Sequence, residues 1–416
     1  MKIYLFHFFL ITLLVHKISF SQQFKDSNIN NLKQKVDSLI NFGIKKKAFP
    51  GAQVYIFKRD SIHINKSYGY HTYDSITPVT NDHLFDLASL TKILASTITL
   101  MKLHELYDLD LNEPVSKWIP LLKRSNKKKH SLKKILSHNA GWIPYISHQN
   151  LIFNKKGNFR HNTLSFNKSN SFPGLVSDSL FVHRRYQKKI FKRIKKTKLL
   201  EGDEMVYSGM FYFFIPELVK RLSGKSLIEF LNYYFYKPMN LKRISYLPLK
   251  KFLRKEIVPT ERDSLFRKRL VHGWVHDEAA SLMGGVSGNA GLFANSESIA
   301  PLLQMLLQKG SYNGKQYLKP KTINTFVQRT FPKSSNPRGL GFDKPSLEDE
   351  QNRYPSNLVS NETFGHTGFT GTMTWVDPIN NFFVILLTNR VYPNRNQKGL
   401  YTLNIRPQLL DYVVKY

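Results

Sequence analysis

The sequence predicts a mixed α/β fold of the α+β type, with one antiparallel sheet built from both chain ends. Strand patterns occur near the start and near the end, helical patterns fill the region between them, and no repeat or low-complexity linker divides the chain. We therefore expect helices to flank the sheet and a mainly helical subdomain to be inserted between its two halves. A substrate site is expected in the cleft between sheet and insertion.

The first expected elements are a helix and a hairpin. Leu32–Phe42 carries apolar residues at helical spacing. Ala52–Lys58 and Ile62–Tyr68 have strand patterns, and the turn residues at 59–61 between them indicate an antiparallel hairpin.

Helical spacing then dominates until the chain returns to strands. Gly371–Val376 and Phe382–Thr388 flank a turn-rich connection, and Leu403–Val414 is expected to form a closing helix. These patterns place a sheet subdomain at about 30–85 and 290–416 and a helical subdomain at about 108–290. The helices expected between the strand regions are Ser89–Tyr107, Leu132–Ser137, Phe211–Leu222, Leu227–Phe235 and Ile299–Gln308.

Residues 1–21 are typical of a secretory signal peptide. Lys2 gives a positive start, Ile3–Val15 is nearly all apolar, and Ser19 and Ser21 are small residues at the −3 and −1 positions of a cleavage site. The apolar run is short for a membrane span, although an uncleaved anchor is the alternative. The sequence thus predicts a periplasmic or secreted protein whose mature domain is 22–416, without a transmembrane anchor.

The chain is strongly basic, with 62 Lys and Arg against 29 Asp and Glu, a formal net charge of +33. The excess gathers at 123–134, 183–198 and 250–269. Such a field attracts polyanions, including acidic envelope polymers, but a Lys-rich surface without a specific partner is favoured because these clusters lie between the motifs. Export argues against nucleic acid as a partner.

Cysteine is absent, which excludes disulfides, thiolate metal sites and a cysteine nucleophile. No spacing of His, Asp or Glu suggests a metal site, and no cofactor is expected.

Ser89 and Lys92 form the first chemical motif. Their i, i+3 spacing places both side chains on one face of a helix. A serine hydroxyl needs a base to remove its proton, and an unprotonated lysine amine can serve. The backbone N–H of Ser89, at the helix start, is available to an oxyanion. Alone the pattern is weak, since a helix-starting Ser followed by a surface Lys gives the same spacing.

Further segments carry polar or glycine-rich patterns. His138 and Asn139 are expected to cap and brace a turn. Asp277 and Glu278 could suggest an acid pair, but neighbours on an extended chain point apart, so we expect them to brace a loop. The glycines at 284, 285, 288 and 291 predict a tight loop near the cleft. The segments, in chain order, are Ile135–Trp142, Tyr207–Gly209, Val275–Ala280, Gly284–Phe293 and His366–Thr372.

In this order the segments resemble the serine β-lactamase-like family, which includes class C β-lactamases, D,D-carboxypeptidases and related esterases. The resemblance runs from about Phe49 to about Arg406. Leu340–Pro345 and Thr388–Pro393 are most similar to the β-lactamase-like domain that some Bacteroidetes proteins carry behind a β-N-acetylglucosaminidase-like domain. Here the signal peptide is expected to lead straight into the serine-hydrolase part.

The resemblance implies a role for each matching residue. Ser89 would be acylated, Lys92 would be its proton-handling partner, and Tyr207 would relay protons to the leaving group. A box on an edge strand would lie beside the serine, and the N–H that follows it would be the second oxyanion donor. The box is His366, Thr367 and Gly368, and that N–H belongs to Phe369.

Two residues depart from the family pattern. Gly209 stands where the central motif usually ends in Asn or Asp. His366 stands where classical β-lactamases have Lys, although His also occurs there among peptidase-like members. Histidine is mostly neutral near pH 7, which weakens recognition of a carboxylate. Both departures argue against an efficient β-lactamase and are compatible with acyl transfer.

The sequence therefore predicts an exported serine hydrolase that forms an acyl-enzyme at Ser89 with an amide, lactam or ester carbonyl. The candidate substrates are cell-wall D-amino-acid peptides derived from peptidoglycan, β-lactams and small esters. One alternative is an inactive protein of the same fold that binds penicillin or wall fragments. Another is a polyanion-binding envelope protein.

Overall fold

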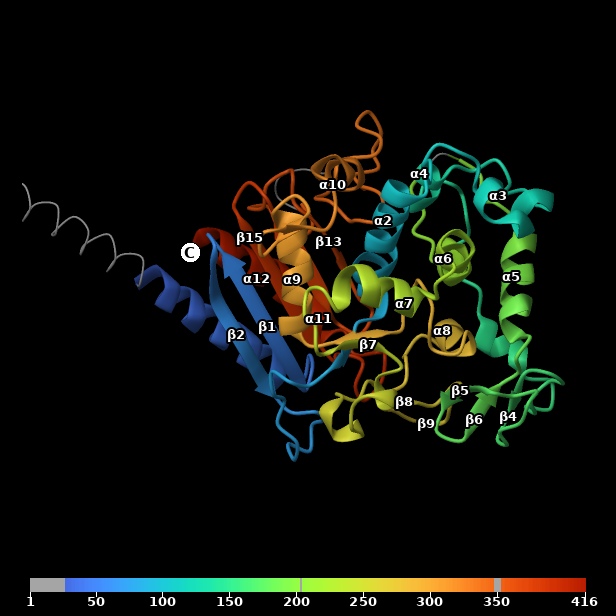
Figure 1. Cartoon of the computed structure of the whole chain (residues 1–416). Helices are drawn as coiled ribbons and strands as arrows, with labels where there is room; N and C mark the ends of the chain where they lie inside the picture. The colour runs from blue at the N-terminus through green and yellow to red at the C-terminus, as the bar shows by residue number, and fades with distance from the viewer. Residues whose placement is uncertain (1–26, 203, 348–352) are drawn as a thin grey trace, which may run out of the picture.

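A five-stranded antiparallel sheet forms one side of the molecule (Figure 1). The computed structural model describes residues 27–202, 204–347 and 353–416, so the predicted signal peptide lies outside the described residues. The first and last parts of the chain meet in this sheet, as predicted. Its strands, in spatial order, are β13 (Phe364–Thr367), β14 (Met373–Asp377), β15 (Phe382–Thr388), β1 (Gly51–Lys58) and β2 (Ser61–Gly69).

The two central strands are apolar on both faces. β1 and β15 pair antiparallel, with Val54 opposite Leu386, and every residue of both strands is buried. The helix over 27–45 and α12 (Ile405–Lys415) cover one face, and α9 (Ser296–Leu307) and α2 (Ile98–Leu106) pack in the core on the other. Burial on both sides explains the nearly continuous apolar runs.

The predicted hairpin is confirmed. β1 and β2 pair antiparallel, and Arg59 and Asp60 between them have φ angles of 49° and 64°. Two successive residues with positive φ form the tight turn whose twist matches paired strands.

The predicted helix over Ser89–Tyr107 is present but irregular. The segment begins with a 3₁₀ turn at Ala88–Leu90, continues as a π-helical stretch at Lys92–Thr97, and becomes α-helical only in α2. A π-helical stretch is wider than an α-helix and frequently occurs at functional sites. Here it carries Lys92.

The middle of the chain contains helices and also small sheets. β10 pairs with β3 and β7, β6 pairs with β4 and β5, and β8 pairs with β9. The helices, including two short ones nearer the C-terminus, are α3 (Val115–Trp118), α4 (Leu132–Leu136), α5 (Tyr186–Lys196), α6 (Ile215–Ser223), α7 (Leu227–Leu231), α8 (Glu278–Leu282), α10 (Pro320–Val327) and α11 (Gly399–Thr402). The small strands are β3 (Phe85–Asp86), β4 (Leu164–Ser165), β5 (Gly174–Ser177), β6 (Leu180–Val182), β7 (Ile244–Tyr246), β8 (Glu261–Asp263), β9 (Arg269–Val271), β10 (Leu292–Ala294), β11 (Ser311–Tyr312) and β12 (Lys315–Gln316).

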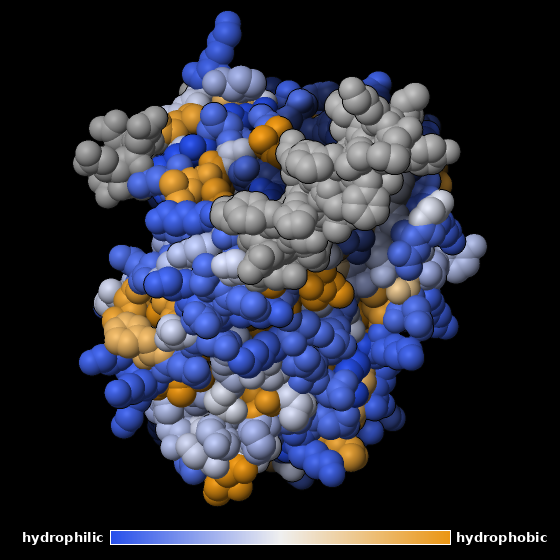
Figure 2. All heavy atoms as spheres, turned by 90° about the vertical axis from the view of Figure 1, so that its left-hand side faces the viewer, coloured by the Kyte–Doolittle hydropathy of each residue, from blue (hydrophilic) through white to orange (hydrophobic). Residues whose placement is uncertain are grey.

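The surface seen from the sheet side is mainly hydrophilic. Figure 2 shows apolar side chains there as scattered spots among polar ones, outside the part that grey atoms cover. Within the described ranges no helix is long and apolar enough to cross a bilayer.

Candidate active site

Ser89 lies in a tightly fixed turn at the start of the π-helical segment. Ala88 before it has a φ of 46°, which is uncommon for a residue with a side chain. Asp86 holds this turn: one carboxylate oxygen accepts the N–H of Ala88 at 2.8 Å and the other accepts the N–H of His276 at 2.6 Å. Burial raises the pKa of Asp86. The strained backbone is thus held in place from two sides.

The loop between β13 and β14 is tied to the same turn. Thr370 Oγ1 donates to the Asp86 carbonyl at 2.7 Å, and Thr372 Oγ1 donates to the Leu87 carbonyl at 3.0 Å. A Cβ on Gly368 would lie 2.1 Å from Thr372 Oγ1 and 2.5 Å from the Leu87 oxygen, so only glycine fits there. β13 is the edge strand of the sheet, and its end lies against the turn that carries Ser89.

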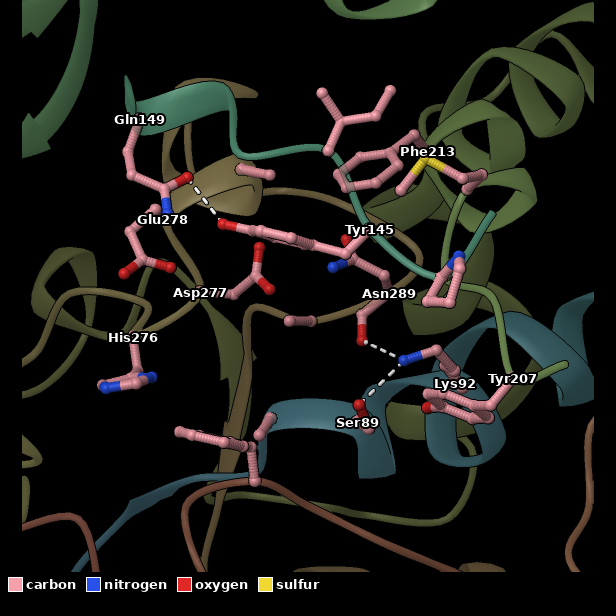
Figure 3. A pocket seen from close by; sticks show the side chains of 18 of the residues that line it. Ser89, Lys92, Tyr145, Gln149, Tyr207, Phe213, His276, Asp277, Glu278 and Asn289 are labelled. Carbon is pink, nitrogen blue, oxygen red and sulfur yellow. Dashed lines mark hydrogen bonds between the residues drawn. The ribbon is translucent and has the colours of Figure 1, made fainter. Parts of the chain in front are cut away.

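The structure brings Ser89 and Lys92 into direct contact. Lys92 Nζ donates to Ser89 Oγ at 2.8 Å and to the Asn289 carbonyl at 3.1 Å (Figure 3). The Lys92 side chain is buried, and Nζ lies 5.3 Å from the ring centre of Tyr207 and 5.5 Å from that of Tyr212. None of the ion pairs within the described residues includes Lys92.

Tyr207 lies with its hydroxyl near this pair. Burial of the phenol raises its pKa, but the charge of Lys92, hydrogen bonds with Lys92 and Ser89, and the charge of Arg338 outweigh burial and lower the pKa below the usual value. Tyr207 is 38% exposed, so its ring borders the open cleft while its hydroxyl faces Ser89. A phenol with a lowered pKa is suited to accept and return a proton.

His138 holds the segment that carries Tyr207. Its carbonyl accepts the N–H of Val206 at 3.0 Å, and its Nδ1 accepts the N–H of Ser208 at 3.1 Å. Its ring lies 4.6 Å from the Tyr207 ring. Burial and the charge of Arg338 keep the pKa of His138 well below its usual value, so the ring is neutral and Nδ1 can accept. The expected turn is present, and His138 has a φ of 58° in it. The sequence did not reveal that this turn supports Tyr207.

His366 lies on β13 facing the cleft and is buried. Its Nδ1 is 2.7 Å from the Thr367 carbonyl, which requires a proton on Nδ1. Burial, followed by the charge of Arg338, holds its pKa well below the usual value. Its Nε2 is buried without a hydrogen-bond partner in the described protein. A neutral His366 therefore supplies no positive charge to the site.

Two arginines that the sequence analysis missed supply that charge. Arg338 is 5% exposed and pairs through one Nη with Asp343, while its Nε and other Nη have no partner within the described residues. Arg406 donates to the carbonyls of Gly368 and Thr372 at 3.2 and 2.9 Å, and its buried Nε is similarly unpaired. The only signal in the sequence was that Arg338 lies two residues before the Leu340–Pro345 segment.

Two cavities meet at Ser89. The first has a volume of about 460 Å³, and the second, of about 720 Å³, lies beside β13. Ser89, Tyr207 and Phe369 line both cavities, so a ligand that spans the two cavities would pass over Ser89. The first cavity is also lined by Lys92, Tyr145, Gln149, Gly209, Asp277, Glu278 and Asn289, and the second by Arg338, Lys344, His366, Thr367 and Arg406.

The premise that Asp277 and Glu278 lie on an extended chain is wrong, whereas the expected bracing role is present, since Asp277 caps a helix and Glu278 pairs with Arg395. They do not lie on an extended chain: Asp277 caps α8 by accepting the N–H of Ala280 at 2.7 Å, and Glu278 is the first residue of that helix. Both line the first cavity (Figure 3), because the helix start turns the two carboxylates toward the same space.

Comparison with known proteins identifies the family. The family model described as beta-lactamase matches residues 30–405. The chain belongs to the beta-lactamase family. A Salmonella agona protein named "Putative D-alanyl-D-alanine carboxypeptidase" is 30% identical over 380 residues, which cover 84% of this chain and 81% of the relative. The chain is therefore a serine hydrolase of the β-lactamase/D,D-peptidase type.

Solved structures of this family share the fold. A class C β-lactamase has a TM-score of 0.65 at 16% identity, with 92% of this chain and 98% of that chain covered. EstCE1, a hydrolase with promiscuous acyltransferase activity, has a TM-score of 0.64 at 18% identity, with 93% and 99% covered. At these identities the likeness concerns the fold alone.

The position of Gly209 is open in this β-lactamase-family site. A Cβ there would meet only Asn289 Cβ, at 4.0 Å. Asn289 lines the same cavity, so an amide is present close to where the family usually has Asn or Asp. The described residues contain no cluster of three or more His, Asp or Glu side chains arranged to hold a metal ion.

Proposed function

We propose that this β-lactamase-family protein is an exported D,D-carboxypeptidase that removes the C-terminal residue from D-amino-acid peptides of the cell wall. The observation that carries the proposal is Arg338, a buried guanidinium with two unpaired N–H-bearing nitrogens at the cavity beside Tyr207. Arginine binds carboxylates through charge-assisted hydrogen bonds, and a buried donor without a partner gains most from such a ligand.

The catalytic steps assign one role to each group. Lys92 and Tyr207 together remove the Ser89 proton as Oγ attacks the scissile carbonyl. The N–H groups of Ser89 and Phe369 stabilise the oxyanion. Tyr207 then passes a proton to the departing amine, the C–N bond breaks, and water hydrolyses the acyl-enzyme.

The direction of binding follows from the charges. In a carboxypeptidase the terminal carboxylate belongs to the leaving residue, so a carboxylate at Arg338 places that residue in the second cavity. The leaving amine then lies on the side of Tyr207, which has to protonate it. β-Lactams also carry a carboxylate near the scissile nitrogen, and we expect them to acylate Ser89.

Export and the relation to Bacteroidetes β-lactamase-like domains remain predictions. Export depends on residues 1–21, which lie outside the described residues. The alternative of a penicillin- or wall-fragment-binding protein without turnover has support from Gly209, where the family's usual amide or carboxylate is missing.

The test compares a peptide ending in D-Ala-D-Ala with the same peptide carrying a C-terminal amide. We expect wild-type protein to form acyl-enzyme about 100-fold faster with the free acid, because a buried charge pair is lost with the amide. The double variant Arg338→Gln/Asp343→Asn removes the cation without leaving a buried carboxylate unpaired, and it should lose this preference.

Intact-protein mass spectrometry follows the adduct, and Ser89→Ala is the control that should show none. If neither the peptides, a penicillin nor a p-nitrophenyl ester gives a Ser89-dependent adduct, the binding-protein alternative is correct. If the double variant keeps the preference for the free acid, Arg338 is not the carboxylate site.

A further inference from the structure

One stretch of the inserted part carries most of the charge excess of the chain. Residues 114–200 contain 21 Lys and Arg and a single acidic residue, Asp178, which pairs with Arg254 outside the stretch at 2.7 Å. Lys117 pairs with Glu113 at 3.1 Å. None of the other Lys and Arg in this stretch has an ion pair within the described residues. Their charge is therefore available to a partner.

Basic segments that are far apart in the sequence meet around α5. Lys127 Nζ donates to the Thr197 carbonyl at 2.6 Å, so the segment around Lys127 lies against the C-terminal end of α5. Near the other end, Lys189 Nζ donates to the Asn162 carbonyl at 2.9 Å. These contacts join three segments into one surface, which we call the basic face, on the side of the molecule where Figure 1 shows α5. The basic face consists of 123–134, 155–168 and 183–198.

α5 buries its apolar side and exposes cations on the other. Lys188, Lys192 and Lys196 are exposed and stand four positions apart, so they form a row along the outer side of the helix. The apolar side is packed in the core and leaves no apolar stripe to insert into lipid. α5 therefore acts on a partner through its charge. The buried residues of the helix are Tyr186, Ile190, Phe191 and Ile194.

Exposed apolar side chains border the basic face. Phe166 is 60% exposed and follows β4, which pairs with β6 shortly before α5. Leu121 and Leu200 are also exposed, and each stands two positions outside a basic segment. An anionic bilayer attracts the cations through its headgroup phosphates and takes up apolar side chains at its interface. A dissolved polyanion attracts the cations but gains nothing from a phenyl ring, so the combination favours a bilayer.

We propose that the basic face docks this protein on a bilayer rich in anionic phospholipids. The lysine row of α5 contacts the headgroup phosphates, and Phe166 enters the interface. The sequence analysis favoured a Lys-rich surface without a partner because the basic segments lie between the motifs, whereas the structure joins those segments into one face. The proposal goes beyond the proposed function and does not depend on it.

The experiment measures co-sedimentation of the chain without residues 1–21 with lipid vesicles. Vesicles of phosphatidylcholine with about 30% phosphatidylglycerol should bind the wild type at least about 100-fold more strongly than phosphatidylcholine alone. Added salt should weaken this binding. Lys188→Gln/Lys192→Gln/Lys196→Gln should lower the partition coefficient about 100-fold, since each lysine near an anionic surface contributes about fivefold. Equal binding of the wild type to both kinds of vesicle would overturn the proposal.

Lys33→Gln/Lys35→Gln/Lys45→Gln is the matched control. These three lysines are exposed on the helix over 27–45, which lies at the other end of the molecule from α5 (Figure 1). The control removes the same charge from a helix and should change the partition coefficient by less than about threefold. A loss as large as that of the α5 variant would show that only net charge matters and would overturn the docking face. Thermal unfolding and acylation by a penicillin should match the wild type in both variants.

Phe166→Ala separates a bilayer from a dissolved polyanion. The variant should bind anionic vesicles about fivefold more weakly, because the phenyl ring no longer enters the interface. Its binding to soluble long-chain polyphosphate should equal that of the wild type. If Phe166→Ala binds vesicles as strongly as the wild type while the α5 variant loses both vesicles and polyphosphate, the partner is a dissolved polyanion and the bilayer proposal is overturned.

Discussion

Gly368→Ala is the sharpest test of how β13 positions the nucleophile. The added Cβ would lie 2.5 Å from the Leu87 carbonyl oxygen and 2.1 Å from Thr372 Oγ1, far inside ordinary contact distance. Thr372 cannot simply rotate away, because its Oγ1 donates to that same carbonyl at 3.0 Å. The main chain two residues before Ser89 therefore has to move.

The expected size of the effect follows from that displacement. Relief of the contact requires a shift of about 1 Å, and a misplacement of this size in a catalytic group costs about 100-fold in rate. The overpacking itself should lower the free energy of unfolding by about 1–3 kcal/mol. The protein should therefore remain folded while acylation slows.

Stopped-flow fluorescence with a labelled penicillin measures the acylation rate, and thermal unfolding measures the loss of stability. Gly209→Ala is the matched control, because its Cβ would meet only Asn289 Cβ at 4.0 Å, and it should change the rate by less than about threefold. If Gly368→Ala acylates as fast as the wild type, the tether between β13 and the Ser89 turn has no part in positioning the nucleophile.

Three further predictions concern titration and support of the site. The acylation rate should rise with pH through an inflection below pH 10, because the lowered pKa of Tyr207 makes its phenolate available at a lower pH. Tyr207→Phe should remove that inflection. An inflection above pH 10 in the wild type would contradict the proton-accepting role of Tyr207. His138→Ala leaves the buried Ser208 N–H without its acceptor and should reduce kcat more than it changes KM, with a stability loss of about 1–3 kcal/mol in denaturant titrations. Burial lowers the pKa of Lys127 from 10.5 to about 8, so the unfolded chain binds more protons between these values and stability should rise with pH across that window. Lys127→Met should remove that rise, and an unchanged pH slope of the unfolding free energy would show that Lys127 titrates normally.

Local relations in the sequence predicted the elements of the fold. The strand patterns at Ala52–Lys58 and Ile62–Tyr68, with turn residues between them, predicted the hairpin because these signals depend only on neighbouring positions. The i, i+3 spacing of Ser89 and Lys92 predicted a shared face because residues three positions apart lie on the same side of a helix. The irregular start of that helix was not predictable, because its bonding depends on the Asp86 tether and on Asn289, which is 197 positions from Lys92.

The charged side chains of the cleft are brought together by tertiary packing, so the sequence analysis missed them. Arg338 reaches the site through its contact with Asp343 and with the Tyr207 ring, at 5.6 Å from the guanidinium carbon to the ring centre. Nothing in the spacing of these residues indicates that contact. The sequence analysis recognised Asp277 and Glu278 as a pair but expected their side chains to point apart on an extended chain. Helix α8 begins there instead.

The replacement of the family's usual lysine by His366 has a physical consequence when Arg338 is considered. A lysine on β13 would add a second basic side chain beside Lys92, and like charges in a buried site repel each other. Burial keeps His366 neutral, and the permanent charge sits on Arg338, which does not lose its proton in the accessible pH range. In the proposed mechanism, Arg338 then keeps its charge for the substrate carboxylate while protons pass between Lys92, Tyr207 and Ser89.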